Sequence, residues 1–166
     1  MVEDRTTKIY LNTWGAYNDG CIGYGWMTTD EAKTFIEKNP ERDGGEWFIA
    51  DIDNYTGYDF KDLDYSNIYD VIRIIETLEN MDEEERREVV ALMEYLGTED
   101  IAEAVDRLDC YTFYEDIDSY YDMCDELIDE QLANMPNIRF YFDYSAYHRD
   151  CEYDVHEMSN GVVIAA

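Results

Sequence analysis

The stretch DIDNYTGYDFKDLDY, from Asp51 to Tyr65, carries five aspartates and four aromatic rings, a density of carboxylates that raises the question of a bound cation. Calcium prefers oxygen ligands at alternating positions of a tight loop, with a glycine at the sixth position and a bidentate glutamate at the twelfth. Here the sixth position is Thr56 and the twelfth is Asp62. The spacing does not fit a calcium loop, so these carboxylates need another explanation.

A second group of residues has the chemical types that bind zinc: His148, Cys151, Asp154 and His156. Their spacing matches no common structural zinc site, and no close pair of cysteines accompanies them. The sequence also lacks a glycine-rich phosphate loop, a nucleophile elbow and an HExxH motif. We therefore expect no catalytic residues, no metal and no cofactor. An enzyme or metal protein stays as an alternative that one or two substitutions or chelation would reveal.

The composition predicts a folded, acidic protein with a basic partner. The 166-residue chain is 46% hydrophobic, and 41 Asp and Glu residues against 12 Lys and Arg residues give a net charge of −29. Sixteen tyrosines argue against an acidic disordered chain, which is normally poor in aromatic residues. Repulsion among like charges destabilises the folded state, so we expect the net charge to serve a function. The alternative is that it only provides solubility or reflects a halophilic source. Nucleic acid and membrane surfaces are anionic and are poor partners.

The sequence also predicts a soluble, unsecreted protein. No apolar run approaches the roughly 20 residues that span a bilayer, and the start MVEDRTTKIYLN lacks a basic leader followed by an apolar stretch. The four cysteines are scattered singly, which fits reduced thiols in a cytosol better than a disulfide framework. They are Cys21, Cys110, Cys124 and Cys151.

Changes in sequence texture predict an elongated α/β (α+β) protein of three lobes, over residues 1–60, 61–109 and 110–166. The first lobe alternates the β-prone runs KIYLNTW, CIGYGWM and EWFIADI with one helix, and Asn-Asp-Gly at 18–20 predicts a hairpin turn. The second carries apolar residues at helical spacing, and the third combines a β-prone CYTFY run with another helix. We expect a small mixed β/α N-terminal lobe, a helical central lobe and an α+β C-terminal lobe.

Helix starts are predicted where a side chain can accept the free N–H groups of a first turn. Thr28 with Glu31 has the pattern of a capping box in the first lobe. The expected caps of the three central helices are Ser66, Asp82 and Thr98.

Residues 116–133 are predicted to form a helix with an acidic face and a broad apolar face. The apolar face is expected to consist of Ile117, Tyr120, Tyr121, Cys124, Leu127, Ile128 and Leu132. The carboxylates recur at spacings of three and four, which makes them neighbours about 5–6 Å apart on a helix surface. They are Asp118, Asp122, Asp125, Glu126 and Asp129. A solvated helix usually alternates acidic and basic residues, but no lysine or arginine lies between Arg107 and Arg139. The carboxylates of this helix are therefore expected to repel one another. We infer that this face meets a basic partner.

Several segments resemble signature segments of the ArdA antirestriction family. They are YNDGCIGYGW at 17–26, EWFIAD ending at Asp51 and above all FDYSAYHRD at 142–150, while LMEYLGTEDIAEAVDRLD sits where that family has its helical centre. The resemblance covers nearly the whole chain. The sequence departs from the family at Tyr24, where the family tends to have Gly, and at Ala50-Asp51, where it tends to have His-Asp.

The resemblance implies an elongated homodimer that mimics bent duplex DNA and occupies the DNA-binding groove of a type I restriction-modification enzyme, at its methyltransferase core. It implies an antirestriction protein of a mobile genetic element that acts in the cytoplasm of a bacterial host and blocks restriction. Whether such a protein also blocks methylation stays open. It implies no enzyme activity and no direct binding of nucleic acid. The dimer is expected to use an apolar patch, because two bodies of such charge repel each other.

On this hypothesis the acids that stand in for phosphates are Asp51, Asp53, Asp59, Asp62, Asp64, Glu115, Asp116, Asp118, Asp122, Asp125, Glu126 and Asp129. The family-motif residues, which we expect to be structural first, are Tyr17, Asn18, Gly20, Trp26, Asp143, Tyr144, Tyr147, Arg149 and Asp150. Tyr55, Tyr58 and Tyr65 are expected to pack the joint between the first two lobes, or alternatively to contact the enzyme through their polar tips.

Charge density limits this hypothesis. A compact protein of this mass exposes on the order of 8,500 Å², so an even spread gives roughly one net charge per 300 Å², against roughly one per 100 Å² on duplex DNA. Mimicry therefore requires the acids to gather on one side or band. The alternative is an acidic binding module for another basic DNA-binding or immune effector protein.

Overall fold

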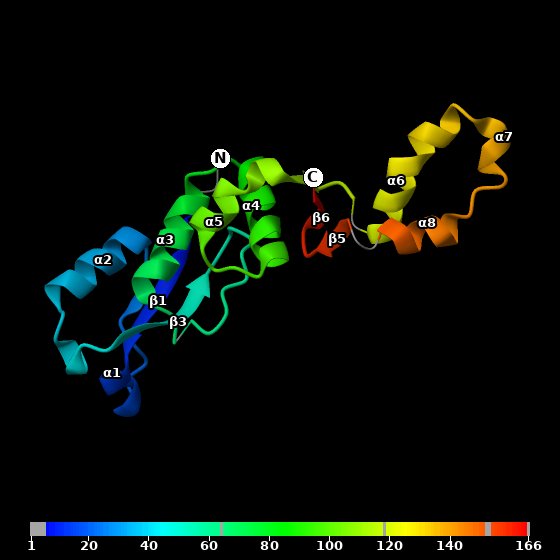
Figure 1. The fold of residues 1–166 in the computed structure, drawn as a ribbon. Coiled ribbons are helices and arrows are strands. Elements are labelled where there is room, and N and C mark those ends of the chain that lie inside the picture. Colours follow the sequence, from blue (N-terminus) through cyan, green and yellow to red (C-terminus); the bar gives the residue numbers. More distant parts are fainter. Residues whose placement is uncertain (1–5, 64, 118, 152–153, 166) are drawn as a thin grey trace, which may run out of the picture. The chain divides into compact units, whose positions relative to one another are not determined.

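The computed structural model describes residues 6–63, 65–117, 119–151 and 154–165. This part of the chain is mixed α/β, with two three-stranded antiparallel sheets and several helices (Figure 1). The chain divides into two compact units, Met1–Asp82 and Glu83–Ala166. The division into three lobes at residues 60 and 109 remains a prediction. Within the described ranges, no helix is long and apolar enough to cross a membrane.

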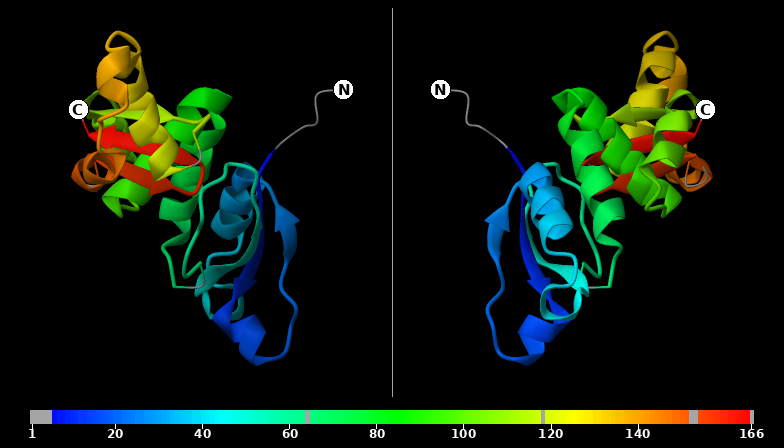
Figure 2. Two further views of the ribbon diagram at one scale, coloured as in Figure 1. Left: turned by 90° about the vertical axis from the view of Figure 1, so that its right-hand side faces the viewer. Right: turned by 90° about the vertical axis from the view of Figure 1, so that its left-hand side faces the viewer.

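The first unit is built on an antiparallel sheet with β1 (Lys8–Thr13) between β2 (Gly25–Met27) and β3 (Trp47–Asp53). α1 (Trp14–Asn18) continues directly from β1, and α2 (Thr29–Lys38) follows β2. A 3-10 turn, η1 (Arg42–Gly44), leads to β3, and α3 (Ile68–Glu79) completes the unit. Figure 2 shows this unit from two further sides, with α2 beside the sheet.

The core of the first unit lies between the sheet and the helices α2 and α3. Ile9 and Leu11, two residues apart on β1, point into it from one face of the sheet. Ala32 and Ile36 of α2 and Ile75 of α3 meet them there. Burial of apolar surface is the main favourable term in folding. Here it offsets the repulsion among the carboxylates on the outside.

A β-bulge in β3 determines which side chains of this strand reach solvent. Tyr10 of β1 pairs with Asp51, whereas Leu11 pairs with Ile49, so that Ala50 is the extra residue. Ile49 is buried, while Ala50 and Asp51 are both exposed. The bulge therefore places Asp51 on the outer face of the sheet.

The second unit starts with α4 (Glu83–Leu96), α5 (Ile101–Asp106) and a 3-10 turn, η2 (Leu108–Cys110). Its sheet has the order β4-β6-β5 and is antiparallel throughout. The strands are β4 (Tyr111–Tyr114), β5 (Val155–Met158) and β6 (Gly161–Ala165). Between β4 and β5 the chain forms α6 (Tyr120–Ala133), α7 (Pro136–Arg139) and α8 (Tyr144–Cys151).

The core of this unit joins α6, α8 and the sheet. Met123 and Cys124 of α6 pack with Cys151 of α8 and with Val155 and Val162 of the two C-terminal strands. The buried residues of α4, which packs on the same sheet, are Val89, Val90, Ala91, Leu92 and Met93.

The helix predicted over 116–133 begins later than expected. It starts at Tyr120, because the hydroxyl of Ser119 accepts the N–H of Asp122 and caps the first turn. Its apolar face also differs from the prediction, since Tyr121 is 62% exposed while Met123, which the prediction omitted, is 1% exposed.

The capping box at the start of α2 is confirmed. The Thr28 hydroxyl accepts the Glu31 N–H, and the Glu31 carboxylate accepts the Thr28 N–H at 2.9 Å. This backbone hydrogen bond is the main cause that lowers the pKa of Glu31.

Two other predicted caps are wrong. Asn67 rather than Ser66 caps α3, and Asp100 rather than Thr98 caps α5, each by accepting a first-turn N–H. The Thr98 hydroxyl instead accepts the N–H of Asp100. Where two capping residues lie close in sequence, local pattern does not decide between them.

The hairpin turn predicted at 18–20 is also wrong, although β1 and β2 pair antiparallel. Thr13 caps α1, so a short helix and a loop make the connection. The β5–β6 hairpin was missed. Asn160-Gly161, a dipeptide favoured in such turns, is the signal that would have revealed it, and Met158 pairs with Gly161 across the turn.

Gly161 tests the packing of the second sheet. Its φ is 153°, and a Cβ there would lie 2.6 Å from a Phe113 ring carbon and 2.6 Å from the Tyr114 carbonyl oxygen. We expect Gly161→Ala to lower the free energy of unfolding by about 2 kcal/mol or more, because overpacking adds to backbone strain. Denaturant titration followed by circular dichroism measures the change.

Gly57→Ala is the matched control. Gly57 also has a positive φ, 83°, but nothing lies within 4 Å of its added Cβ. Equal losses for the two variants would contradict the role assigned to the contact with β4.

Candidate acidic interaction surface

The described acids of the stretch from 51 to 65 all face solvent. Asp51 and Asp53 lie on β3, and Asp59 and Asp62 lie in the connection that leads to α3. The Asp51 carboxylate accepts the N–H of the next residue, Ile52. None of these four aspartates forms an ion pair with a described residue. Asp64 lies outside the described residues. These carboxylates are free to meet a partner.

The same connection is fixed by local bonds. The Asn54 carboxamide oxygen accepts the N–H and the hydroxyl of the buried Thr56, and its NH₂ donates to the Tyr58 carbonyl at 2.7 Å. The rings of Tyr58 and Phe60 meet edge to face at 4.7 Å. Tyr65 does not follow the expectation of packing, because 82% of its surface is exposed.

The acids of the second unit divide into paired and unpaired groups. Glu115 forms an ion pair with Arg87 of α4, with 2.5 Å between the charged atoms, and this hydrogen bond is the main cause that raises the pKa of Arg87. Asp116, by contrast, is exposed and makes no ion pair with a described residue. Asp118 lies outside the described residues.

On α6 the acidic face is split between solvent and neighbouring helices. Asp125 binds the Nε2 atom of His148 on α8, with 2.8 Å between the two atoms. Asp129 accepts from Arg139 of α7 at 3.0 and 3.1 Å, and from the Tyr144 hydroxyl at 3.3 Å.

Asp122 and Glu126, on the same helix, are exposed. Asp122 accepts the hydroxyl of its cap, Ser119, at 2.6 Å. The prediction that all five acids form one unrelieved acidic face is therefore wrong. The partners of Asp125 and Asp129, His148 and Arg139, come from α8 and α7, later in the chain.

The C-terminal motif FDYSAYHRD forms α8 and the residues just before it. The Asp143 carboxylate accepts the Ala146 N–H at 3.0 Å and so caps the helix. Tyr147 packs against the core around Cys124 and Cys151. Burial raises the pKa of the Tyr147 hydroxyl, and it raises the pKa of the Cys124 thiol to about 12. Asp143 and Tyr147 thus make structural contacts, while the structural role expected of the whole motif stays a prediction.

Arg149 and Asp150, which complete the motif, are exposed. Arg149 pairs with neither Asp143 nor Asp150, nor with any other described acid.

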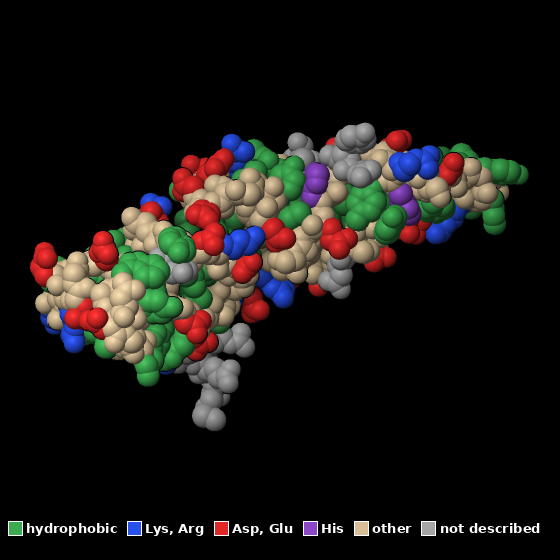
Figure 3. Space-filling view, turned by 90° about the horizontal axis from the view of Figure 1, so that it is seen from below, with side chains coloured by type: hydrophobic (Ala, Val, Ile, Leu, Met, Phe, Trp, Pro, Cys, Tyr) green, Lys and Arg blue, Asp and Glu red, His purple; other side chains and the backbone are tan. Residues whose placement is uncertain are grey.

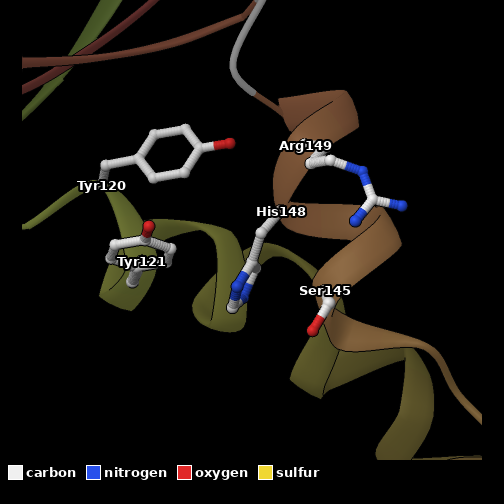
Figure 4. A pocket seen from close by; sticks show the side chains of 5 residues that line it. All are labelled: Tyr120, Tyr121, Ser145, His148 and Arg149. Atoms are coloured by element: carbon white, nitrogen blue, oxygen red, sulfur yellow. The ribbon is translucent and has the colours of Figure 1, made fainter.

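A pocket of about 410 Å³ lies between the start of α6 and α8 (Figure 4). Its lining residues are Tyr120, Tyr121, Ser145, His148 and Arg149. In Figure 4 the His148 ring points between the two helices, whereas the Arg149 side chain points away from the tyrosine rings. The polar groups of the pocket do not converge on one ligand position.

The profile of a family described as antirestriction protein (ArdA) matches residues 9–164. The match covers both compact units and every strand and helix described above except the first residue of β1 and the last of β6. The chain belongs to the ArdA antirestriction family. This is a family of inhibitors of restriction rather than of enzymes, and its activity is directed against restriction-modification enzymes. No curated protein sequence matches the chain significantly.

The N-terminal motif of this ArdA-family chain lies on α1, the loop after it and β2. Asn18 ends α1, and Gly20 has a φ of 78° in the loop. Trp26 of β2 is half-exposed and meets the Tyr10 ring edge to face at 5.3 Å. Tyr17 is 59% exposed. Two of the four residues, Tyr17 and Trp26, therefore offer aromatic surface to solvent.

The residues considered for zinc are not brought together in this ArdA-family protein. His148 binds Asp125, whereas the ring of His156 lies 4.6 Å from that of Tyr95. Cys151 is buried in the core. Among the described residues, no group of three or more His, Cys, Asp or Glu side chains is placed to hold a metal ion.

Carboxylates occur in small groups on the face seen in Figure 3, and Lys or Arg side chains adjoin several of them. The ion pairs of the described residues include local ones, such as Arg73 with Asp70 on α3 and Arg107 with Glu103 at the end of α5. On α4, burial first and then the charges of the neighbouring Glu84 and Glu85 raise the pKa of Glu88.

The difference between paired and unpaired acids on α6 is testable. Asp129→Asn weakens the contact of α6 with Arg139 and Tyr144, so we expect a lower thermal unfolding midpoint. Glu126→Gln makes the same change of charge at an exposed residue and should leave the midpoint unchanged. Differential scanning fluorimetry compares the two variants. Equal midpoints would show that Asp129 has no structural role.

Proposed function

We propose that this ArdA-family protein inhibits a type I restriction-modification enzyme by placing carboxylates where the enzyme's methyltransferase core binds DNA phosphates. The observation that carries the proposal is the set of exposed carboxylates without an ion pair, in a chain that belongs to an antirestriction family. A groove that binds DNA is basic, because Lys and Arg neutralise the phosphates. Such a groove attracts this protein for the same reason.

The pairing of the acids refines the list of phosphate mimics. Glu115, Asp125 and Asp129 bind Arg87, His148 and Arg139, so their charge is partly used inside the protein. The unpaired members remain the primary candidates. They are Asp51, Asp53, Asp59, Asp62, Asp116, Asp122 and Glu126.

We further propose that the protein is a homodimer joined through α7 and its flanks. Four large apolar side chains are exposed there, Met135, Ile138, Phe140 and Tyr141, and the last two are 89% and 88% exposed. Residues 131–142 contain no Asp or Glu. This segment therefore adds no carboxylate to the contact, and the Asp129 carboxylate that reaches it is paired with Arg139. Burial of the rings supplies the attraction between two copies. The proposed setting is the cytoplasm of a bacterial host.

The target is tested by displacement of a labelled duplex from a purified type I methyltransferase core, followed by fluorescence anisotropy. We expect the protein to release the duplex. A triple variant of unpaired acids, Asp51→Asn, Asp53→Asn and Asp59→Asn, should release it several-fold less effectively, while each single change has a small effect.

The matched control neutralises three acids that pair within their own helices. It combines Asp30→Asn, Asp70→Asn and Glu103→Gln, whose partners are Lys33, Arg73 and Arg107. Both triple variants have the same net charge. An equal loss for both would contradict the assignment of the unpaired acids, and a wild-type protein that leaves the duplex bound would contradict the target.

The dimer is tested by sedimentation velocity. We expect Phe140→Asp to shift the protein to monomer, because the change adds a charge to the apolar patch. Ile22→Asp, at a residue that is 86% exposed on the first unit, should leave the dimer intact. A wild-type monomer, or a dimer that persists in the Phe140 variant, would contradict the proposed interface.

A further inference from the structure

A cluster of aromatic rings lies at the start of α1. Three of its rings, those of Trp14, Tyr17 and Tyr65, are not part of the core around Ile9 and Leu11. Trp14 stacks on Phe48 of β3, with 4.4 Å between ring centroids and 22° between planes. Tyr17 meets the Trp14 ring edge to face at 5.8 Å, and Tyr65 lies 6.0 Å from it. We call these four residues the Trp14 ring cluster.

Only the base of the Trp14 ring cluster is buried. Phe48 is 4% exposed, whereas Tyr17 is 59% and Tyr65 is 82% exposed. A ring with so little buried area contributes little to folding, since hydrophobic stabilisation follows the area removed from water. Tyr17 and Tyr65, which come from segments far apart in the sequence, thus both contact Trp14 and expose most of their surface to solvent.

An aspartate lies close in sequence to each of the two exposed tyrosines. Asp19 directly follows α1, two residues after Tyr17, and its N–H donates to the Gly15 carbonyl at 3.1 Å. Asp62 accepts the Tyr65 N–H with its carbonyl oxygen at 2.9 Å. The side chains of Asp19 and Asp62 are exposed and form no ion pair with a described residue.

The same unit shows how this chain holds an arginine. The guanidinium carbon of Arg42 lies 4.7 Å from the centre of the Tyr24 ring and 5.7 Å from that of Phe35. Its Nε atom is 3.7 Å from the Asp43 carboxylate, which also accepts the Tyr24 hydroxyl. An arginine therefore sits here between ring faces and a carboxylate, a combination that cation–π attraction favours.

We propose that the Trp14 ring cluster is a second such site, open to solvent, that receives an arginine side chain of the basic partner. This inference rests on the proposed function for the existence of a basic partner, and it adds ring faces to the carboxylates as a means of recognition. Guanidinium groups are weakly hydrated and stack on aromatic faces, while phosphate mimicry by carboxylates alone would not distinguish Arg from Lys. Asp19 and Asp62, which are exposed and two or three residues from Tyr17 and Tyr65 in the chain, supply the complementary charge.

The site is tested on the full-length protein with a short peptide of alternating arginine and glycine. A peptide with citrulline in place of arginine keeps the shape and removes the charge. We expect saturable NMR shifts of the ring protons of Trp14, Tyr17 and Tyr65 with the arginine peptide and none with the citrulline peptide. Absence of saturable shifts at these rings would overturn the proposal.

Two substitutions of Tyr65 separate a ring contact from a hydroxyl contact. Tyr65→Phe should keep the peptide affinity, and Tyr65→Leu should weaken it roughly 2- to 5-fold, because leucine has no π face. Tyr69→Leu is the control, at a 51% exposed tyrosine that makes no ring contact with a described residue. Unchanged affinity in Tyr65→Leu would overturn the proposal, and unchanged unfolding midpoints exclude a folding defect as the cause of any loss.

The duplex displacement assay separates this inference from the proposed target. If the wild-type protein displaces the duplex and Tyr65→Leu does so equally well, the ring cluster has no part in inhibition, and the proposed function stands without it. If the rings bind the arginine peptide but the protein leaves the duplex bound, the target is wrong and the arginine site stands.

Discussion

Repulsion among carboxylates is the constraint under which the whole structure is built, because 41 Asp and Glu residues share 12 Lys and Arg residues. Small apolar cores offset this repulsion, among them one between β1, β3, α2 and α3 and one between α6, α8 and the C-terminal strands. Some of the few cations pair locally, such as Arg73 with Asp70, while others join different elements of the chain. Lys33 links α2 to Glu76 of α3, Arg87 links α4 to Glu115, and Arg139 links α7 to Asp129.

This use of cations sorts the acids into two groups. Acids that bind a residue of another element, such as Glu76, Glu115 and Asp129, hold helices and strands together, and neutralising them changes the fold as well as the charge. The remaining exposed acids, such as Asp51, Asp59 and Glu126, have no such partner among the described residues, so their repulsion is unrelieved in the free protein. A basic partner relieves it. Membership in the ArdA family and the unpaired carboxylates on the surface therefore indicate the same kind of partner, a basic one.

The sequence predicted features that depend on local contacts better than those that depend on tertiary contacts. Thr28 and Glu31 lie within one turn, so their capping box was identified correctly. The acidic face of α6 was misjudged, because Arg139 and His148 reach it from later helices and no spacing within 116–133 reports them. The exposure of Asp51 depends on the extra residue at Ala50. Likewise, nothing local shows that Tyr65 stands beside Trp14 instead of packing inward.

The central claim is that exposed carboxylates provide the affinity for the restriction enzyme. The most direct measurement is the affinity of the wild-type protein for a type I methyltransferase core between ~50 and ~200 mM salt. We expect the affinity to fall steeply over this range, in parallel with the affinity of duplex DNA for the same core, because screening weakens contacts between charges. Tight binding that does not change with salt would contradict the account, since apolar contacts would then carry the complex.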